Sequence, residues 1–131
     1  IVCDYLTANI DRHTRNLGII RDAETLAWRG TAPIFDNGRG FYHSARTERE
    51  LTESLLPYDA RVFDNGVEGP LALVHDFSWL NFDTLRAFAP TVREIMAHTL
   101  HPAWFAKAAK GQFLLRVDAL ERAAMAHGSS K

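Results

Sequence analysis

Apolar and polar positions divide the chain into a β-containing first part and a helical second part. Apolar residues at positions 1, 2, 5 and 6 predict a helix over residues 1–9. Residues 17–21 and 25–29 have strand-like composition and are separated by a polar turn at 22–24, which predicts a β-hairpin. Residues 32–36 then continue from the end of this hairpin.

The second part of the chain reads as a series of helices. Thr47 and Glu50 have the spacing of a capping box and predict a helix that carries Leu51, Leu55 and Leu56 and stops before Pro57. Asn65-Gly66 predicts a turn. Three further helix starts are predicted, at Asn81 as an N-cap, at Pro90 in a first turn and at Pro102, with the last helix ending near Gly128.

These elements predict one domain over residues 1–131, of the α+β class and mainly α-helical. The formal net charge of −1 gives no electrostatic reason to expect direct nucleic-acid binding. The single cysteine, Cys3, fits a reducing compartment and is expected on a buried helix face. No apolar run approaches the roughly 20 residues that cross a bilayer. We therefore expect a cytoplasmic protein that does not enter the membrane.

Three polar residues are candidates for phosphoryl-transfer chemistry. Asn16 follows Asp11 by five positions, and Asp36 lies beyond the predicted hairpin. Protein kinases place a catalytic Asp and a metal-binding Asn at this spacing, with a second metal-binding Asp further on. A hairpin can bring its two ends together, as a shared metal site requires. Each residue taken alone also fits an ordinary turn.

The surrounding residues resemble a particular family of kinases. The segment Asn9-Ile10-Asp11-Arg12-His13-Thr14-Arg15-Asn16, followed by Ala32-Pro33-Ile34-Phe35-Asp36, is similar to the N-x-D-R-H-x-x-N loop and the A-P-x-[YF]-D segment of HipA-like serine/threonine kinases. The stretch 74–80 also looks similar to helical segments of that family. The resemblance covers most of the chain and is sharpest over residues 4–38.

The resemblance implies the C-terminal lobe of a protein-kinase-like fold, with a small β-hairpin between the catalytic loop and the metal-binding Asp. It implies that Asp11 is the catalytic Asp and that Asn16 and Asp36 bind Mg²⁺, with ATP as co-substrate and a protein Ser or Thr as acceptor. It also implies a toxin–antitoxin setting with a small antitoxin partner. A lipid or small-molecule acceptor, and a non-catalytic binding module, remain alternatives.

The chain departs from the kinase template in its lysines. Lysine occurs only at positions 107, 110 and 131, so no strand Lys precedes the loop, and no Gly-rich phosphate loop precedes it either. The chain also opens without Met, on what reads as a helix entered part-way. We therefore expect an N-terminal lobe to be absent from this segment, which leaves the nucleotide-binding residues unknown and the isolated segment inactive.

The residues around Asp11 are expected to support the loop. Arg12 is predicted to pair with a carboxylate such as Asp4, and His13 is predicted to brace the loop through a hydrogen bond to the backbone. Asn9 completes the family pattern. His98 and His101 have a metal-ligand spacing, but without a third ligand nearby two ordinary histidines are the better interpretation.

Overall fold

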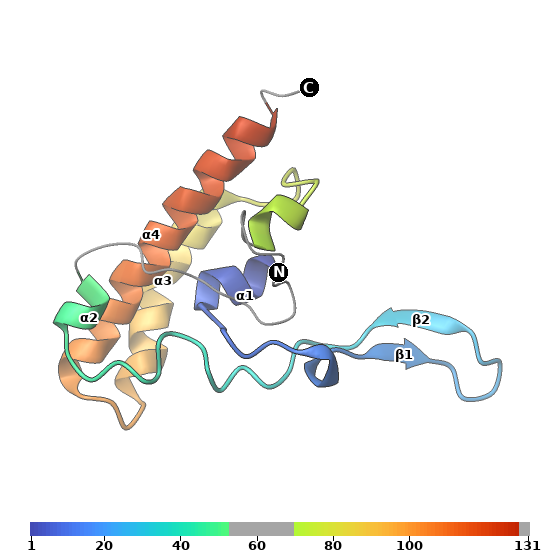
Figure 1. Ribbon diagram of the computed structural model, residues 1–131, viewed down its shortest axis with the longest axis horizontal. Coiled ribbons are helices and arrows are strands. Elements are labelled where there is room, and N and C mark those ends of the chain that lie inside the picture. Colours follow the sequence, from blue (N-terminus) through green and yellow to red (C-terminus); the bar gives the residue numbers. More distant parts are fainter. Residues whose placement is uncertain (53–69, 129–131) are drawn as a thin grey trace.

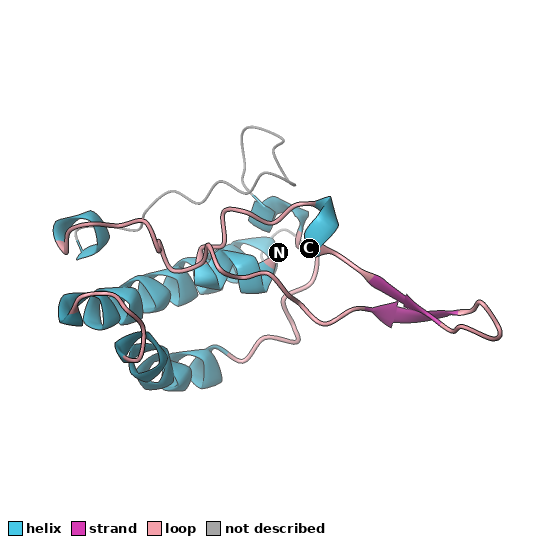
Figure 2. Ribbon diagram, turned by 90° about the horizontal axis from the view of Figure 1, so that it is seen from below, coloured by secondary structure: helices cyan, strands magenta, loops and turns pink. Residues whose placement is uncertain are grey.

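The computed structural model describes residues 1–52 and 70–128 and has an α+β architecture, about half helical with a small two-stranded sheet (Figure 1). Its helical part packs together, while the β-hairpin extends away from the helices. The view from below shows the same division, with the strands at one end of the molecule (Figure 2). The predicted fold class is confirmed at this level.

Two long antiparallel helices form the core of the helical part. Helix α3 spans Phe82–Ala97, and helix α4 spans Ala103–Gly128. The short helix α1, Val2–Thr7, packs against them. Side chains from all three helices build one hydrophobic cluster, whose buried members are Val2, Tyr5, Leu6, Ala89, Val92, Phe113, Val117 and Leu120. Burial of these apolar surfaces stabilises the arrangement.

Helix α3 begins as predicted and then differs from the prediction. Asn81 is its N-cap, and its side-chain oxygen accepts a hydrogen bond of 2.8 Å from the backbone N–H of Thr84. Pro90 does not begin a new helix: it lies inside α3. An internal proline normally breaks a helix at a cost of about 3 kcal/mol. Here Ala89 and Val92 are buried on either side of it, so tertiary packing outweighs the local penalty.

An ion-pair network joins α3 to α4. Arg86 Nη2 donates to Asp118 Oδ1 at 2.9 Å and also to the carboxylate of Glu121. These hydrogen bonds raise the pKa of the Arg86 guanidinium above its ordinary value. Because the side chain of Arg86 is 35% exposed, solvent screens the network, and we assign most of the helix pairing to apolar burial.

The hairpin pairs β1, Ile19–Arg21, with β2, Trp28–Thr31, in antiparallel register. The return strand begins later than predicted because the turn is longer. Asp22 Oδ1 accepts from the backbone N–H groups of Glu24 and Thr25, and Leu26 has a φ of 59°. Both strands are exposed along their whole length.

Helix α2 covers Arg49–Thr52, so the beginning of the helix predicted after Thr47 is confirmed. Glu50 Oε2 reaches back to accept from the backbone N–H of Arg46 at 2.9 Å. Leu51 is buried, and its carbonyl accepts from Gln112 of α4 at 2.8 Å. The predicted continuation through Leu55, Leu56 and Pro57, the Asn65-Gly66 turn and the tail after Gly128 lie outside the described residues.

The prediction for Cys3 was wrong, because this residue is exposed. The buried side of α1 is formed by Val2, Asp4, Tyr5 and Leu6. Successive residues of an α-helix are rotated by about 100°, so position 3 falls beyond the edge of that face. Among the helices that the structure describes, none is long and apolar enough to cross a membrane.

Candidate functional site

The candidate site begins where α1 ends. Ala8 adopts a left-handed conformation with φ 49°, and its N–H bonds back to the helix. Asn9 follows in a fully buried position, where its backbone N–H donates to the carbonyl of Asp4 at 2.8 Å. Its side-chain oxygen accepts from the backbone N–H of Asp11 at 3.2 Å. Asn9 therefore supports the turn that presents Asp11, as the sequence predicted.

Arg12 is the centre of the site. Only 1% of its surface is exposed, and its guanidinium pairs with Asp4, with Nη2 2.7 Å from Oδ1 and Nε 3.1 Å from both carboxylate oxygens. The predicted Asp4–Arg12 pair is therefore confirmed. A buried ion pair is stable only when further hydrogen bonds satisfy the remaining polar atoms.

Those further bonds from Arg12 join the two sequence motifs. Nη1 donates to the carbonyl of Asn16 at 3.1 Å and to the carbonyl of Phe35 at 2.6 Å. Nη2 donates to Asn37 Oδ1 at 2.5 Å. A single nitrogen thus holds the backbone of Asn16 and the backbone of the residue before Asp36. The two ends of the hairpin lie side by side because one arginine binds both.

Asp11 and Asn16 belong to one short loop. Asn16 ends the 3-10 turn Thr14–Asn16 and is 4% exposed. Its Nδ2 donates to the carbonyl of Asp11 at 3.3 Å, which orients the side-chain amide. The carboxylate of Asp11 is 26% exposed, and its Oδ2 lies 3.6 Å from Nε of Arg39. Asp11 therefore has access to solvent, while its backbone is fixed by the two asparagines.

Asp36 and Asn37 face different surroundings. Asp36 is exposed and has a φ of 56°, which is uncommon for a residue with a side chain. The amide oxygen of Asn37 accepts from both Arg12 and Asn9, at 2.5 and 3.3 Å. The sequence reasoning missed Asn37. A buried arginine needs several hydrogen-bond acceptors, and this requirement is the feature of the sequence that could have indicated Asn37.

His13 does not act as predicted through its Nδ1 atom. This nitrogen is buried and has no hydrogen-bond partner among residues 1–52 and 70–128. The backbone bond expected for it is therefore not made by this atom. The ring itself is partly exposed at the start of the 3-10 turn, where His13 is the N-cap with extended φ and ψ angles.

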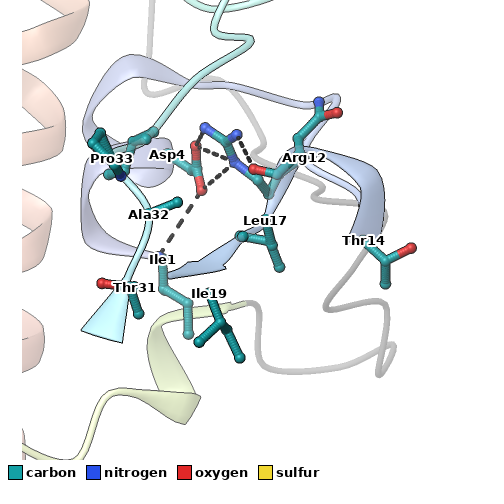
Figure 3. A pocket seen from close by; sticks show the side chains of 12 residues that line it. Ile1, Asp4, Arg12, Thr14, Leu17, Ile19, Thr31, Ala32 and Pro33 are labelled. Atoms are coloured by element: carbon teal, nitrogen blue, oxygen red, sulfur yellow. Dashed lines mark hydrogen bonds and ion pairs between the residues drawn. The ribbon is translucent and has the colours of Figure 1, made fainter. Parts of the chain in front are cut away.

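A pocket of about 560 Å³ opens beside the Asp4–Arg12 pair (Figure 3). Leu17, Ile19 and Pro33 contribute apolar walls, and the buried ion pair closes one end. Its size falls in the range of small-molecule sites. Asn16 also lines this pocket, whereas Asp11 and Asp36 do not.

A buried arginine of α4 holds the segment that follows the site. The guanidinium of Arg116 lies over the rings of Tyr5 and Tyr42, with Cζ 4.9 and 5.3 Å from their centroids. Burial raises the pKa of Tyr5, an effect that the positive charge of Arg116 opposes. Burial also lowers the pKa of Arg116. These contacts join α1, the segment after Gly40 and α4.

The histidines of the helical part show no metal site. His98 is the C-cap of α3, and His101 stacks on Phe105 with ring centroids 3.9 Å apart. Within the described residues, no group of three or more His, Cys, Asp or Glu side chains could hold a metal ion. The candidate pair Asn16 and Asp36 is smaller than such a group and includes an amide.

Comparison of the chain with protein-family models, with curated proteins and with solved structures found no match. The function proposed below therefore depends on the residues of the loop and on their geometry.

Proposed function

We propose that this chain is the C-terminal catalytic lobe of an ATP- and Mg²⁺-dependent serine/threonine protein kinase of the HipA-like type. The observation that carries the proposal is the pair of hydrogen bonds from Arg12 Nη1 to the carbonyls of Asn16 and Phe35. They place Asn16 beside the residue that precedes Asp36. In protein kinases the corresponding Asn and Asp hold the Mg²⁺ ions on the nucleotide phosphates, which requires the two side chains to lie close together.

The donor atoms fit a magnesium ion. Asn16 offers an amide oxygen and Asp36 a carboxylate, and Mg²⁺ prefers oxygen ligands. Proteins commonly hold this ion with one or two side chains and leave its other positions to water and substrate phosphates. A site of two protein ligands is therefore sufficient. Bound there, Mg²⁺ would neutralise charge on the phosphates of ATP.

Asp11 would orient the acceptor. Its carboxylate is partly exposed, so a Ser or Thr hydroxyl can approach it from solvent. As the hydroxyl oxygen forms its bond to the γ-phosphorus, the bond from that phosphorus to ADP breaks, and the hydroxyl proton passes to Asp11. The bonds of Asn9 and Asn16 to the backbone of Asp11 fix the point from which this carboxylate extends. Such positioning is the main source of catalysis in phosphoryl transfer.

The setting of the kinase follows from the resemblance alone. HipA-like kinases imply a toxin–antitoxin pair in the cytoplasm, and we extend that setting to this chain as part of the proposal. The kinase template also requires a lysine for the phosphates, and no lysine precedes Lys107. We therefore expect the isolated chain to bind ATP weakly, and the decisive assay uses the full-length gene product.

The test is transfer of radiolabelled γ-phosphate from ATP by the full-length gene product, with Asp11→Ala as the variant. We expect the rate to fall by at least about 100-fold, the usual contribution of a positioned base. Asp83→Ala is the matched control, because the side chain of Asp83 on α3 is fully exposed at 101%. Activity of Asp11→Ala within about tenfold of the wild type would refute the proposed role. Parallel arms with lipid and small-molecule acceptors identify the substrate class.

A further inference from the structure

The segment that follows Asp36 is held in an unusual conformation close to Asp11. Asp36, Phe41 and Tyr42 all have positive φ angles, of 56°, 52° and 54°. Such angles cost about 1–3 kcal/mol each and persist where the surrounding structure fixes them, commonly at functional sites. The loop 36–42 is therefore a conformation imposed on the chain by its contacts.

Contacts with the end of α1 fix this loop. The backbone N–H of Phe41 donates to the carbonyl of Thr7 at 2.5 Å. A Cβ atom at Gly40 would lie 3.2 Å from that same carbonyl oxygen and 3.3 Å from the carbonyl oxygen of Asn37. The close approach therefore favours glycine at position 40. Together with the bonds of Asn37 to Arg12, these contacts leave Arg39 between two anchored points.

Arg39 lies against the predicted catalytic carboxylate. Its Nε is 3.6 Å from Oδ2 of Asp11, and its side chain is 52% exposed. It can therefore reach a ligand that arrives from solvent. Arg12 cannot do the same, because it is buried and its Nε, Nη1 and Nη2 all donate to protein oxygens. Lys107 and Lys110 belong to α4 and not to the loop that carries Asp11.

We propose that Arg39 is a phosphate-binding residue that exchanges Asp11 for the γ-phosphoryl group of the nucleotide. This inference rests on the proposed kinase function. When the triphosphate binds, the guanidinium moves to the phosphoryl oxygens, and the carboxylate of Asp11 becomes available to the acceptor hydroxyl. Arginine suits this exchange because its planar fork binds carboxylates and phosphates equally well.

The role of Arg39 in the step is electrostatic. The acceptor oxygen bonds to the γ-phosphorus, the bond to the β-phosphate oxygen breaks, the proton goes to Asp11 and ADP leaves. The guanidinium of Arg39 neutralises the charge on the transferring group. An arginine supplied for this purpose raises the rate of phosphoryl transfer by about 10³–10⁵-fold in other phosphoryl-transfer enzymes.

The experiment measures kcat and KM for Mg-ATP in the full-length gene product and in Arg39→Ala and Arg39→Lys. We expect Arg39→Ala to lower kcat by at least about 100-fold with KM within about threefold, and Arg39→Lys to recover part of kcat. ADP with aluminium fluoride imitates the transferring phosphoryl group. In Arg39→Ala the affinity for this complex should fall at least about tenfold, while the affinity for ADP alone is unchanged. Arg29→Ala is the control, since Arg29 is exposed on the hairpin.

Each of the following results would overturn the inference. A kcat for Arg39→Ala within about twofold of the wild type excludes a role in the step. A kcat that rises shows that Arg39 only blocks Asp11. An equal loss of affinity for ADP and for ADP with aluminium fluoride shows a general structural role. If the wild type remains folded but transfers no phosphate, both the proposed function and this inference fail. If transfer is lost in Asp11→Ala but not in Arg39→Ala, the proposed function stands and the role of Arg39 is refuted.

Discussion

Replacing Arg12 with Ala should destabilise the protein more than any other single substitution in the loop. The change removes the guanidinium that binds Asp4, Asn37 and the carbonyls of Asn16 and Phe35. It leaves the carboxylate of Asp4, on a residue that is 4% exposed, without its guanidinium partner, so that among the residues that the structure describes only Asn9 Nδ2 and the N-terminal ammonium of Ile1 remain close to it. Breaking a buried pair by removal of one member costs about 3–5 kcal/mol.

This magnitude is a large share of the total, since domains of this kind have free energies of unfolding of about 5–15 kcal/mol. Urea denaturation of the wild type, Arg12→Ala and Arg29→Ala measures it. Arg29 also pairs with an aspartate, but its side chain is 62% exposed, so its loss should change the midpoint far less. The double variant Asp4→Leu/Arg12→Met should recover the part of the loss that comes from the Asp4 carboxylate, because apolar groups can replace a buried pair. The part that comes from the carbonyls of Asn16 and Phe35 should remain, because both lose their donor in either variant.

The reasoning would be refuted if Arg12→Ala lowered the free energy of unfolding by less than about 1 kcal/mol, or by no more than the Arg29 control. Equal stability of Arg12→Ala and the double variant would also contradict it, because the unpaired Asp4 carboxylate would then carry no penalty.

Three further predictions concern the hairpin, α1 and the core. Hydrogen bonds from the backbone of Thr25 and from Arg29 lower the pKa of Asp22 to about 2. The contribution of Asp22 to hairpin stability is therefore present above its ordinary pKa of 3.8 and is lost as the pH falls toward 2. A side-chain NMR titration of Asp22 should give the low pKa, and a pKa near 3.8 would contradict the turn geometry. Cys3 should react with a thiol reagent in the folded protein as fast as in a short peptide, and protection in the native state would show that it is buried. Leu120→Ala should lower the free energy of unfolding by about 2–5 kcal/mol, because Leu120 is fully buried. Leu100→Ala is the control and should leave stability nearly unchanged, because Leu100 is exposed. Similar effects of the two substitutions would contradict the position of the core.

Local signals in the sequence predicted much of the fold. The helix predicted over residues 1–9, the hairpin and the Asn81 cap each depend on neighbouring residues, and each is present, although α1 is shorter than predicted and covers Val2–Thr7. Pro90 was misjudged because the forces that keep α3 continuous come from α4, which no local pattern reveals. Cys3 was misjudged because it lies on the side of α1 opposite to the buried residues Val2, Asp4, Tyr5 and Leu6.

The candidate site was predictable in its polar residues but not in how they are held together. A carboxylate partner for Arg12, such as Asp4, was predicted, and Asp4 is that partner. The bonds from Arg12 to Asn37 and to the carbonyl of Phe35 cross the hairpin, so they depend on tertiary geometry. The contact between Arg39 and Asp11 likewise appears only when the loop after Asp36 folds back onto α1.

Under the proposed function, Asn16 and Asp36 hold one divalent cation on a nucleotide. Binding of Mn²⁺ in place of Mg²⁺ to the ADP complex of the full-length gene product, followed by electron paramagnetic resonance, measures this directly. We expect Asn16→Ala and Asp36→Ala each to weaken Mn²⁺ binding by at least about tenfold, as loss of a metal ligand or its support does, while Asp83→Ala has no effect. Wild-type affinity in both variants would contradict the claim.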